Sequence, residues 1–199
     1  MYKKIAIVSL MSASLITSGC AGFKEHNLSE VSKDDIKISS ENKVKLFSRW
    51  TLINNSSIAN DQINAAGAAI HKKNFENALS ESNCCIIVES PSEADVIVDG
   101  KGYNDNNMAA VFPAFITGLT LFVIPSWATA KFHISAEVKS KSESESYELK
   151  DSMTMVQWLP MIFVMPFTGT PFKAEKEVGE NTYRSLVFKM KQEGFLSKT

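Results

Sequence analysis

Side chains that commonly bind metal ions are few in this sequence, and their spacing does not suit a metal site. The three histidines, His26, His71 and His133, are far apart in the chain, and none belongs to an HExxH arrangement. No CxxC pair occurs either. These patterns bring zinc ligands together on one helix or turn. We therefore expect neither a metal ion nor another cofactor, and we interpret each histidine as a solvated surface residue.

Residues for acid–base catalysis or phosphate binding are not arranged for those reactions. Asp95 and Asp99 lie in a predicted strand, where four residues separate side chains by about 13 Å, too far for a cooperating carboxylate pair. Gly100 and Gly102 lack the spacing and the following helix of a phosphate-binding loop, so we interpret them as a bulge or a strand end. No GxSxG nucleophile motif occurs. The sequence thus predicts that the protein is not an enzyme.

Two adjacent cysteines, Cys84 and Cys85, begin a short apolar run of strand type. Neighbouring strand residues point to opposite faces, so one thiol is expected to be buried and the other partly exposed. Two unpaired cysteines in a mostly buried strand are the expected state. A disulfide between the two residues and an intermolecular bridge are the alternatives, because an exposed thiol is unusual in an oxidising compartment.

The first residues have the layout of a bacterial secretory signal. Lys3 and Lys4 form a positively charged start, and the apolar residues 5–16 follow. The next stretch, LITSGC, resembles the lipobox of bacterial lipoproteins, with Thr17 in place of the more usual Leu. In that family the cysteine, here Cys20, becomes the lipid-modified first residue of the mature protein.

The lipobox resemblance implies a cellular location for the protein. Residues 1–19 would be a signal peptide, and acyl chains such as palmitate on Cys20 would anchor the chain, since each buried CH₂ contributes about 0.8 kcal/mol. Ala21 follows the cysteine, where Asp would resemble an inner-membrane retention signal. We therefore expect a lipid-anchored protein of the bacterial cell envelope, with the outer membrane favoured and the domain facing the periplasm.

Composition indicates one globular domain without affinity for nucleic acid. The 199 residues include 21 Lys and Arg against 22 Asp and Glu, and no basic cluster with interleaved aromatic residues occurs. Residues 20–42 are polar without a sustained period, which is typical of a tether. Residues 43–199 are long enough for a single domain with a substantial core.

Hydrophobic periodicity predicts the order of elements in that domain. Strands are expected at 43–53, 84–89, 94–103, 130–140 and 146–153, and helices from Ser56 or Ser57 to about Ser80 and from Pro171 to Gly194. The last two strands would form an antiparallel hairpin. The predicted fold class is α+β, with a mainly antiparallel sheet of about five strands and two helices.

Two apolar insertions interrupt this pattern, at about 104–129 and 155–171. No charged residue occurs between Asp105 and Lys131, or between Asp151 and Lys173. The first insertion enters the predicted hairpin at its beginning and the second leaves at its end. Because antiparallel partners run in opposite directions, both insertions should emerge at one sheet edge.

The large apolar side chains of the insertions must be buried somewhere, and three sites compete. They could contact a membrane, span it, or pack in the core or an oligomer interface. A 19-residue helix would reach about 28 Å, close to the thickness of a bilayer core, but the prolines and the shorter second insertion weaken a spanning pair. Membrane contact is favoured. The candidate contact residues are Phe112, Phe115, Ile116, Leu119, Leu121, Phe122, Trp127, Trp158, Met161, Ile162 and Phe163.

The lipobox together with "SEADVIVDG", "GLTLFVIPSW", "DSMTMVQWLPMIFVMPF" and "PFKAEKEVGENTYRSL" resembles a group of bacterial lipoproteins with no assigned activity, over roughly residues 85–195. The element order is similar, more distantly, to periplasmic domains such as the TolB amino-terminal domain and the curli-secretion lipoprotein. The resemblance implies a lipid anchor and no particular reaction.

These observations predict an envelope lipoprotein with a non-catalytic interaction or structural role. Its partners would be the membrane, through Cys20 and the apolar insertions, and either further copies of the chain or another envelope protein. Nucleic acid is not expected as a partner. The alternative is a subunit of a homo-oligomeric membrane assembly for transport or secretion.

Overall fold

The computed structural model describes residues 19–39, 42–54, 61–104 and 111–197. Apart from Gly19, the predicted signal peptide lies outside the described residues, as does the predicted cap of the first helix. The strands are β1 (Cys20–Lys24), β2 (Val44–Asn54), β3 (Cys85–Ile87), β4 (Val96–Asn104), β5 (Ser126–Lys139) and β6 (Ser144–Gln157). The helices are α2 (Lys33–Ile36), α3 (Asp61–Ser82), α4 (Val111–Leu119), α5 (Met161–Thr168) and α6 (Pro171–Gln192), with a 3₁₀ turn η1 (Pro91–Glu93).

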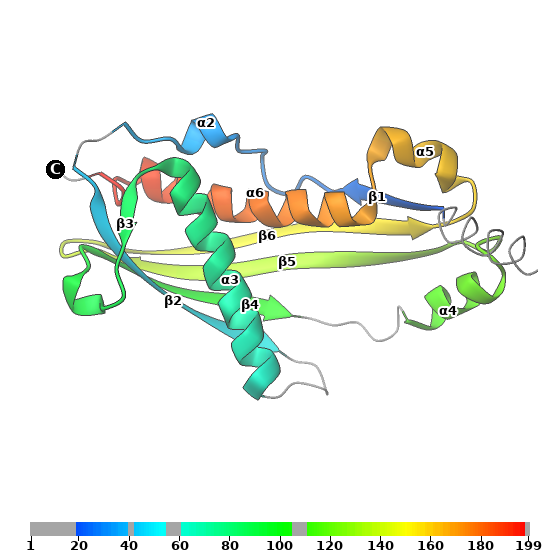
Figure 1. The fold of residues 1–199 in the computed structure, drawn as a ribbon, viewed down its shortest axis with the longest axis horizontal. Helices are drawn as coiled ribbons and strands as arrows, with labels where there is room; N and C mark the ends of the chain where they lie inside the picture. The colour runs from blue at the N-terminus through cyan, green and yellow to red at the C-terminus, as the bar shows by residue number, and fades with distance from the viewer. Residues whose placement is uncertain (1–18, 40–41, 55–60, 105–110, 198–199) are drawn as a thin grey trace, which may run out of the picture. The chain divides into compact units, whose positions relative to one another are not determined.

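The strands form one mixed sheet in the order β1-β6-β5-β4-β2-β3 (Figure 1). β1 pairs antiparallel with β6, and β4 pairs antiparallel with β5. β2 pairs parallel with both β3 and β4. The α+β class is therefore confirmed. The finer prediction differs in part, because the sheet is mixed and has six strands rather than about five, and α2, α4 and α5 occur beside the two expected helices. The physical reason is the order strand, helix, strand: α3 carries the chain back along β2, so β3 must run in the same direction as β2.

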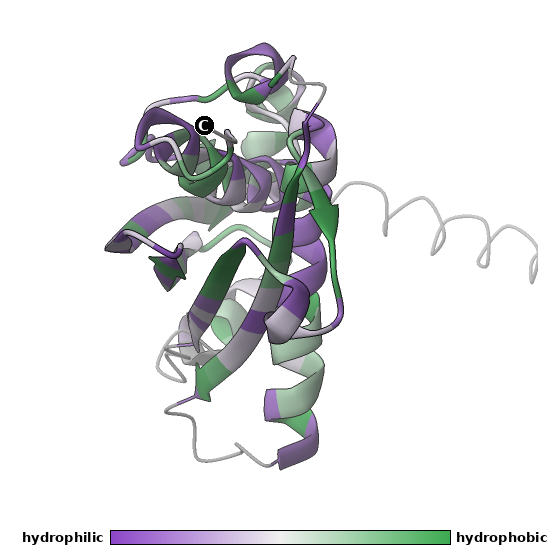
Figure 2. Ribbon diagram, turned by 90° about the vertical axis from the view of Figure 1, so that its left-hand side faces the viewer, coloured by the Kyte–Doolittle hydropathy of each residue, from purple (hydrophilic) through white to green (hydrophobic). Residues whose placement is uncertain are grey.

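The amphipathic strands explain the sheet's two different faces. Hydrophobic and hydrophilic residues alternate along them, as the colours of Figure 2 show. In β4, Val96 and Val98 are buried on one face, while Asp99 on the other face binds the Arg49 guanidinium at 2.7 Å. One face of β4 therefore packs in the core, and the other carries charged side chains.

The contacts of the chain divide it into two compact units. Unit 1 comprises the described residues of Met1–Glu25, Asn107–Ala130 and Met153–Lys176, and unit 2 those of His26–Asn106, Lys131–Ser152 and Glu177–Thr199. Residues 43–199, predicted as a single domain, contribute to both units. Each apolar insertion falls mostly in unit 1, together with the residues around Cys20.

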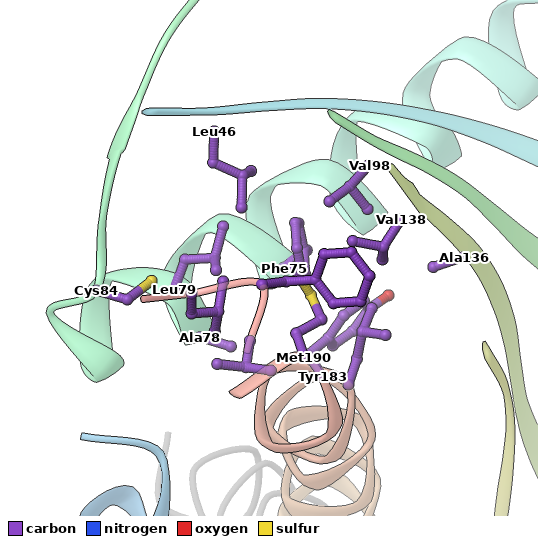
Figure 3. Close-up of a cluster of buried hydrophobic side chains, with 14 of the residues drawn as sticks. Leu46, Phe75, Ala78, Leu79, Cys84, Val98, Ala136, Val138, Tyr183 and Met190 are labelled. Atoms are coloured by element: carbon purple, nitrogen blue, oxygen red, sulfur yellow. The ribbon is translucent and has the colours of Figure 1, made fainter. Parts of the chain in front are cut away.

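Unit 2 contains the hydrophobic core, between the sheet and the helices α3 and α6 (Figure 3). Both helices occur where the sequence predicts them, and Gly194, with a φ of 83°, lies just beyond α6. Apolar side chains from both helices and from four strands meet there, among them Leu46, Phe75, Leu79, Val98, Val138, Leu149 and Met190. Burial of this cluster is the main favourable contribution to the stability of unit 2.

The segment 20–42 is not the polar tether that its composition predicts. Its first five residues form β1, and Ala21 is 0% exposed. Further on, α2 has a Ser32 cap and buries Ile36 completely. A few apolar residues are enough to pack a polar segment against the rest of the protein, because each one faces the protein while its charged neighbours face solvent.

Gly100 and Gly102 lie inside β4 rather than at a bulge or a strand end. The register between β2 and β4 is unbroken past both residues. A Cβ at Gly100 would overlap the Trp50 ring, and one at Gly102 would overlap the His71 ring. These glycines are therefore required for close approach of two side chains to the strand.

Candidate membrane or partner interface

The first apolar insertion forms a short helix and a turn. α4 ends because Leu121 and Phe122 adopt left-handed backbone conformations, with φ of 50° and 64°. The Phe122 N–H then donates to the Thr117 carbonyl at 2.8 Å, which closes the helix end. Pro125 follows and β5 begins one residue later. A continuous 19-residue helix over 109–127 is therefore not formed.

The helices of unit 1 are short. The nine residues of α4 rise about 13 Å and the eight residues of α5 about 12 Å. Among the residues that the structure describes, no helix has the length and apolarity needed to cross a membrane.

The second insertion forms α5, which begins after Pro160 and ends at Gly169. The Gly169 N–H donates to the Met165 carbonyl at 2.8 Å, and the φ of Gly169 is 86°. Only glycine adopts this backbone geometry readily, so Gly169 separates α5 from α6.

The two insertions meet, as the hairpin connectivity predicts. Ser126 at the start of β5 donates its hydroxyl to Gln157 at the end of β6, at 3.4 Å. The Leu159 N–H donates to the Phe122 carbonyl at 2.8 Å, which joins the two insertions directly. Both α4 and α5 therefore lie at the same end of the β5–β6 hairpin (Figure 1).

The predicted contact residues divide into exposed and half-buried side chains. Exposed are Phe115, Leu119, Leu121, Trp127, Trp158 and Phe163. Half-buried are Ile116, Phe122, Met161 and Ile162. The side chain of Phe112 lies outside the described part of the chain. Most of the predicted residues thus point away from the protein interior rather than into it.

Further exposed apolar side chains of unit 1 were not singled out by sequence reasoning. They are Val123, Ile124, Leu159, Phe167 and Phe172, of which Phe167 is 89% exposed. The sequence feature that could have identified them is the absence of charged residues between Asp105 and Lys131 and between Asp151 and Lys173. We call these five and the six exposed predicted residues the unit 1 apolar surface. Moving one such side chain from water to apolar surroundings releases about 1.5–3 kcal/mol when burial is complete.

Charged residues of unit 1 lie outside the two insertions. Described examples are Lys24 at the end of β1, Glu25 directly after it, and Lys173, Glu175 and Lys176 in α6. Glu25 accepts a hydrogen bond from the Thr154 hydroxyl at 2.8 Å. The α4 and α5 segments themselves therefore present no charge to a partner.

Cys20 is placed within unit 1 as the first residue of β1. It pairs with Gln157, the last residue of β6, and the Gly19 carbonyl accepts a hydrogen bond from the Trp158 N–H at 2.7 Å. Trp158 belongs to the unit 1 apolar surface. The predicted lipidation residue and the apolar surface are thus joined by strand pairing.

His71 is half-buried in unit 2 rather than solvated, contrary to prediction. Its ring stacks on Trp50 at 5.9 Å between centroids, and its Nδ1 lies 2.6 Å from the Tyr183 hydroxyl. Burial lowers the pKa of His71 and raises that of Tyr183. A side-chain hydrogen bond with Asn74 opposes part of the rise in the Tyr183 pKa. This pair lines a cleft of about 250 Å³ in unit 2, whose other walls are mainly apolar.

His133 is on the outward face of β5, as expected, and it has two partners there. It stacks on Tyr103 with 4.0 Å between ring centroids, and its Nε2 is 2.9 Å from the Glu148 carboxylate. Within the described residues, no group of His, Cys, Asp and Glu is arranged to hold a metal ion.

Cys84 and Cys85 are joined by a disulfide in the structure, which was an alternative in the sequence prediction. Cys84 is buried in the core and its carbonyl accepts from the Val44 N–H at 3.3 Å. Cys20 is not part of a disulfide.

Neither protein-family models nor curated proteins give a match to this sequence. Among solved structures, a point variant of the PelC dodecamer from Paraburkholderia phytofirmans, in space group C2, is similar over 84% of this chain and 97% of that chain, at 8% identity and a TM-score of 0.35. A PelC dodecamer from the same organism in space group P6 is similar over 80% and 97%, at 8% identity and a TM-score of 0.27. At these TM-scores the likeness supports no conclusion about function.

Proposed function

We propose that this protein is a lipid-anchored component of the bacterial cell envelope with a non-catalytic interaction or structural role. Acyl chains on Cys20 hold it on a membrane, the outer membrane being favoured, and its unit 1 apolar surface contacts that membrane or a partner. The proposal joins the lipobox resemblance of the sequence to the arrangement of unit 1.

The position of Cys20 is the observation that carries the proposal. A tether of some twenty residues would let the domain move far from its lipid. Instead, Cys20 begins a strand that pairs with β6. Its partner there is Gln157, which directly precedes the exposed Trp158. Acyl chains on Cys20 therefore start beside the unit 1 apolar surface, and both enter the same apolar environment.

Acyl chains and exposed apolar side chains on one surface add their contributions to membrane attachment. Acyl chains alone bind with about 0.8 kcal/mol per buried CH₂, and exposed apolar side chains add their own transfer free energy. The exposed side chains of α4 and α5 would otherwise face water at a cost on the order of 10 kcal/mol in total. A role at an apolar surface explains why they are exposed.

Metabolic labelling with a radioactive fatty acid tests the lipid anchor. The full chain is expressed in a bacterium that exports lipoproteins, beside Cys20→Ala and the double variant Cys84→Ala/Cys85→Ala. We expect label in the wild-type chain and in the double variant, and none in Cys20→Ala. Label that persists in Cys20→Ala, or is absent from all three, would show that Cys20 is not the acylated residue.

The alternative role, a subunit of a homo-oligomeric transport or secretion assembly, uses the same surface differently. In that case the apolar side chains would lie between copies of the chain. Sizing of the lipidated protein in mild detergent distinguishes the two roles. A monomer supports direct membrane contact, and a ring of defined size supports the assembly.

A further inference from the structure

We infer that the unit 1 apolar surface inserts into a single leaflet of the membrane, with α4, the turn after it and α5 in the hydrocarbon. The inference rests on the proposed function and names its partner, the lipid acyl chains. Three features of unit 1 support lipid over a protein partner: its satisfied backbone, its inward hydroxyls and its lack of charge.

Backbone N–H groups of the turn after α4 are all hydrogen-bonded within the chain. The amides of residues 120–123 donate to the carbonyls of Ile116, Gly118, Thr117 and Thr120, and the Ile124 amide donates to the Thr120 hydroxyl. Pro125 has no N–H to satisfy. Irregular backbone tolerates hydrocarbon only when its polar groups are bonded internally, because lipid offers no partners.

The entry to α5 is satisfied in the same way. The amides of Leu159 and of residues 161–163 donate to carbonyls of the chain, and Pro160 has no N–H. The Trp158 amide donates to Gly19, a bond that cleavage before Cys20 would remove. Trp158 therefore belongs at the membrane boundary, where water can replace that carbonyl and where tryptophan is commonly found.

Three threonine hydroxyls at α4 and α5 bond to the backbone of their own segments. Thr117, Thr120 and Thr168 donate to the carbonyls four residues earlier, at 3.0, 3.0 and 3.4 Å. A typical protein–protein interface carries about ten direct hydrogen bonds between the partners. Hydroxyls that are satisfied within the helix suit an environment that cannot bond to them.

The depth of insertion follows from the helix lengths. Half of a bilayer hydrocarbon core is about 15 Å, and α4 and α5 rise about 13 and 12 Å. Each helix thus fits one leaflet whether it stands upright or lies flat. The same leaflet would hold the acyl chains on Cys20.

Vesicle binding by an unlipidated chain tests the inference. The chain from residue 20 with Cys20→Ala keeps every strand and helix that the structure describes. It is sedimented with vesicles of phosphatidylcholine alone, at low and high salt. We expect binding that salt does not weaken, because the inserted segments carry no charge.

A matched pair of variants locates the binding surface. Phe163→Ser/Phe167→Ser removes two side chains that are 79% and 89% exposed, and we expect at least about tenfold weaker binding. Ile70→Ser/Ile86→Ser removes exposed apolar side chains of unit 2 and should leave binding unchanged. Circular dichroism of both variants should match that of the parent chain, since all four positions are exposed.

Several outcomes would overturn the inference. The unlipidated chain could stay in solution as a monomer, form a defined oligomer that does not bind vesicles, or bind only anionic vesicles at low salt. Failure of the fatty-acid labelling alone would reject the lipid anchor but leave the vesicle result standing. Failure of vesicle binding alone would reject leaflet insertion but leave the lipid anchor standing.

Discussion

Single side chains in unit 2 are fixed by close approach to the backbone of β4. Trp50 lies against Gly100 and His71 lies against Gly102. The two rings occupy the space that a Cβ at each glycine would need, and they stack on each other. Tyr183 completes the group from α6 through its hydrogen bond to His71. At this scale the glycines of the sequence GKG allow close packing, and His71 packs against one of them.

Gly100→Ala should destabilise unit 2 by about 1–3 kcal/mol, because the new methyl group would overlap the Trp50 ring. Urea unfolding followed by the emission of the buried Trp50 measures the change. Gly118→Ala is the control, since a Cβ at Gly118 meets nothing within 4 Å. In that exposed helical position alanine should be neutral or stabilising by up to about 1 kcal/mol. Equal effects of the two substitutions would contradict the packing argument.

His71 should make the stability of unit 2 depend on pH. Burial lowers its folded pKa, so the unfolded chain binds a proton more readily than the folded chain. The contribution of neutral His71 to the free energy of unfolding is complete above the pKa of the unfolded chain, about 6.5. It falls as pH drops below that pKa, by at most about 1.4 kcal/mol per pH unit. Unfolding measured between pH 8 and 5.5 tests this. His71→Gln should remove the dependence, because Glu81 and Glu148, whose pKa values are lowered, protonate only at more acidic pH.

At the scale of elements, β1 changes the interpretation of the amino-terminal segment. It pairs with β6 along five residues, and Gly22 lies so close to α6 that a Cβ would be 2.8 Å from Pro171 Cα. A few residues further along the chain, α2 is hydrogen-bonded to α6. The Lys191 ammonium of α6 donates to the Asp35 and Lys37 carbonyls. The residues after Cys20 are thus part of the fold.

Ala21→Asp should disrupt β1, because it would place a carboxylate where the side chain is 0% exposed. A buried, unpaired carboxylate costs several kcal/mol, so the strand would detach rather than hold the charge. Hydrogen exchange of residues 20–24 should become fast in this variant and stay slow in Ala21→Ser. Asp at this position would also resemble an inner-membrane retention signal. A localisation experiment with Ala21→Asp would therefore change the structure as well as the signal. Slow exchange in Ala21→Asp would contradict the assignment of β1.

At the scale of the whole molecule, apolar surface is divided unevenly between the two units. Unit 2 buries a continuous core of aliphatic and aromatic side chains, and its ion pairs, such as Arg184 with Glu81 at 2.8 Å, lie around that core. Unit 1 exposes many of its large apolar side chains. Most large apolar side chains of unit 2 are therefore buried within the chain, whereas the membrane contact that we propose would cover those of unit 1.

Nonionic detergent micelles should therefore protect one unit selectively. In the unlipidated chain, amides of residues 115–124 and 158–169 should exchange more slowly once micelles are added, because the surrounding side chains become covered. Core amides of β2, β4 and α3 should be unaffected. Hydrogen exchange read out by mass spectrometry compares the two sets in one sample. Uniform protection, or none, would argue against selective contact by unit 1.

The sequence by itself determined the local features of this protein. Alternation identified β2, β4 and the β5–β6 hairpin, a helical stripe ending at Gly194 identified α6, and chain connectivity alone required the two insertions to meet. These features depend on neighbouring residues, whose period of two or 3.6 fixes which side faces the core.

Only the tertiary structure decided the features that depend on residues far apart in the chain. The pairing of Cys20 with Gln157, the parallel pairing of β2 and the fit of Trp50 on Gly100 each join distant segments. The left-handed residues Leu121 and Phe122 turned an apparent spanning helix into a short one. Exposure of an apolar side chain is likewise set by what packs over it, and composition can state that a segment is apolar but not which of its side chains remain uncovered.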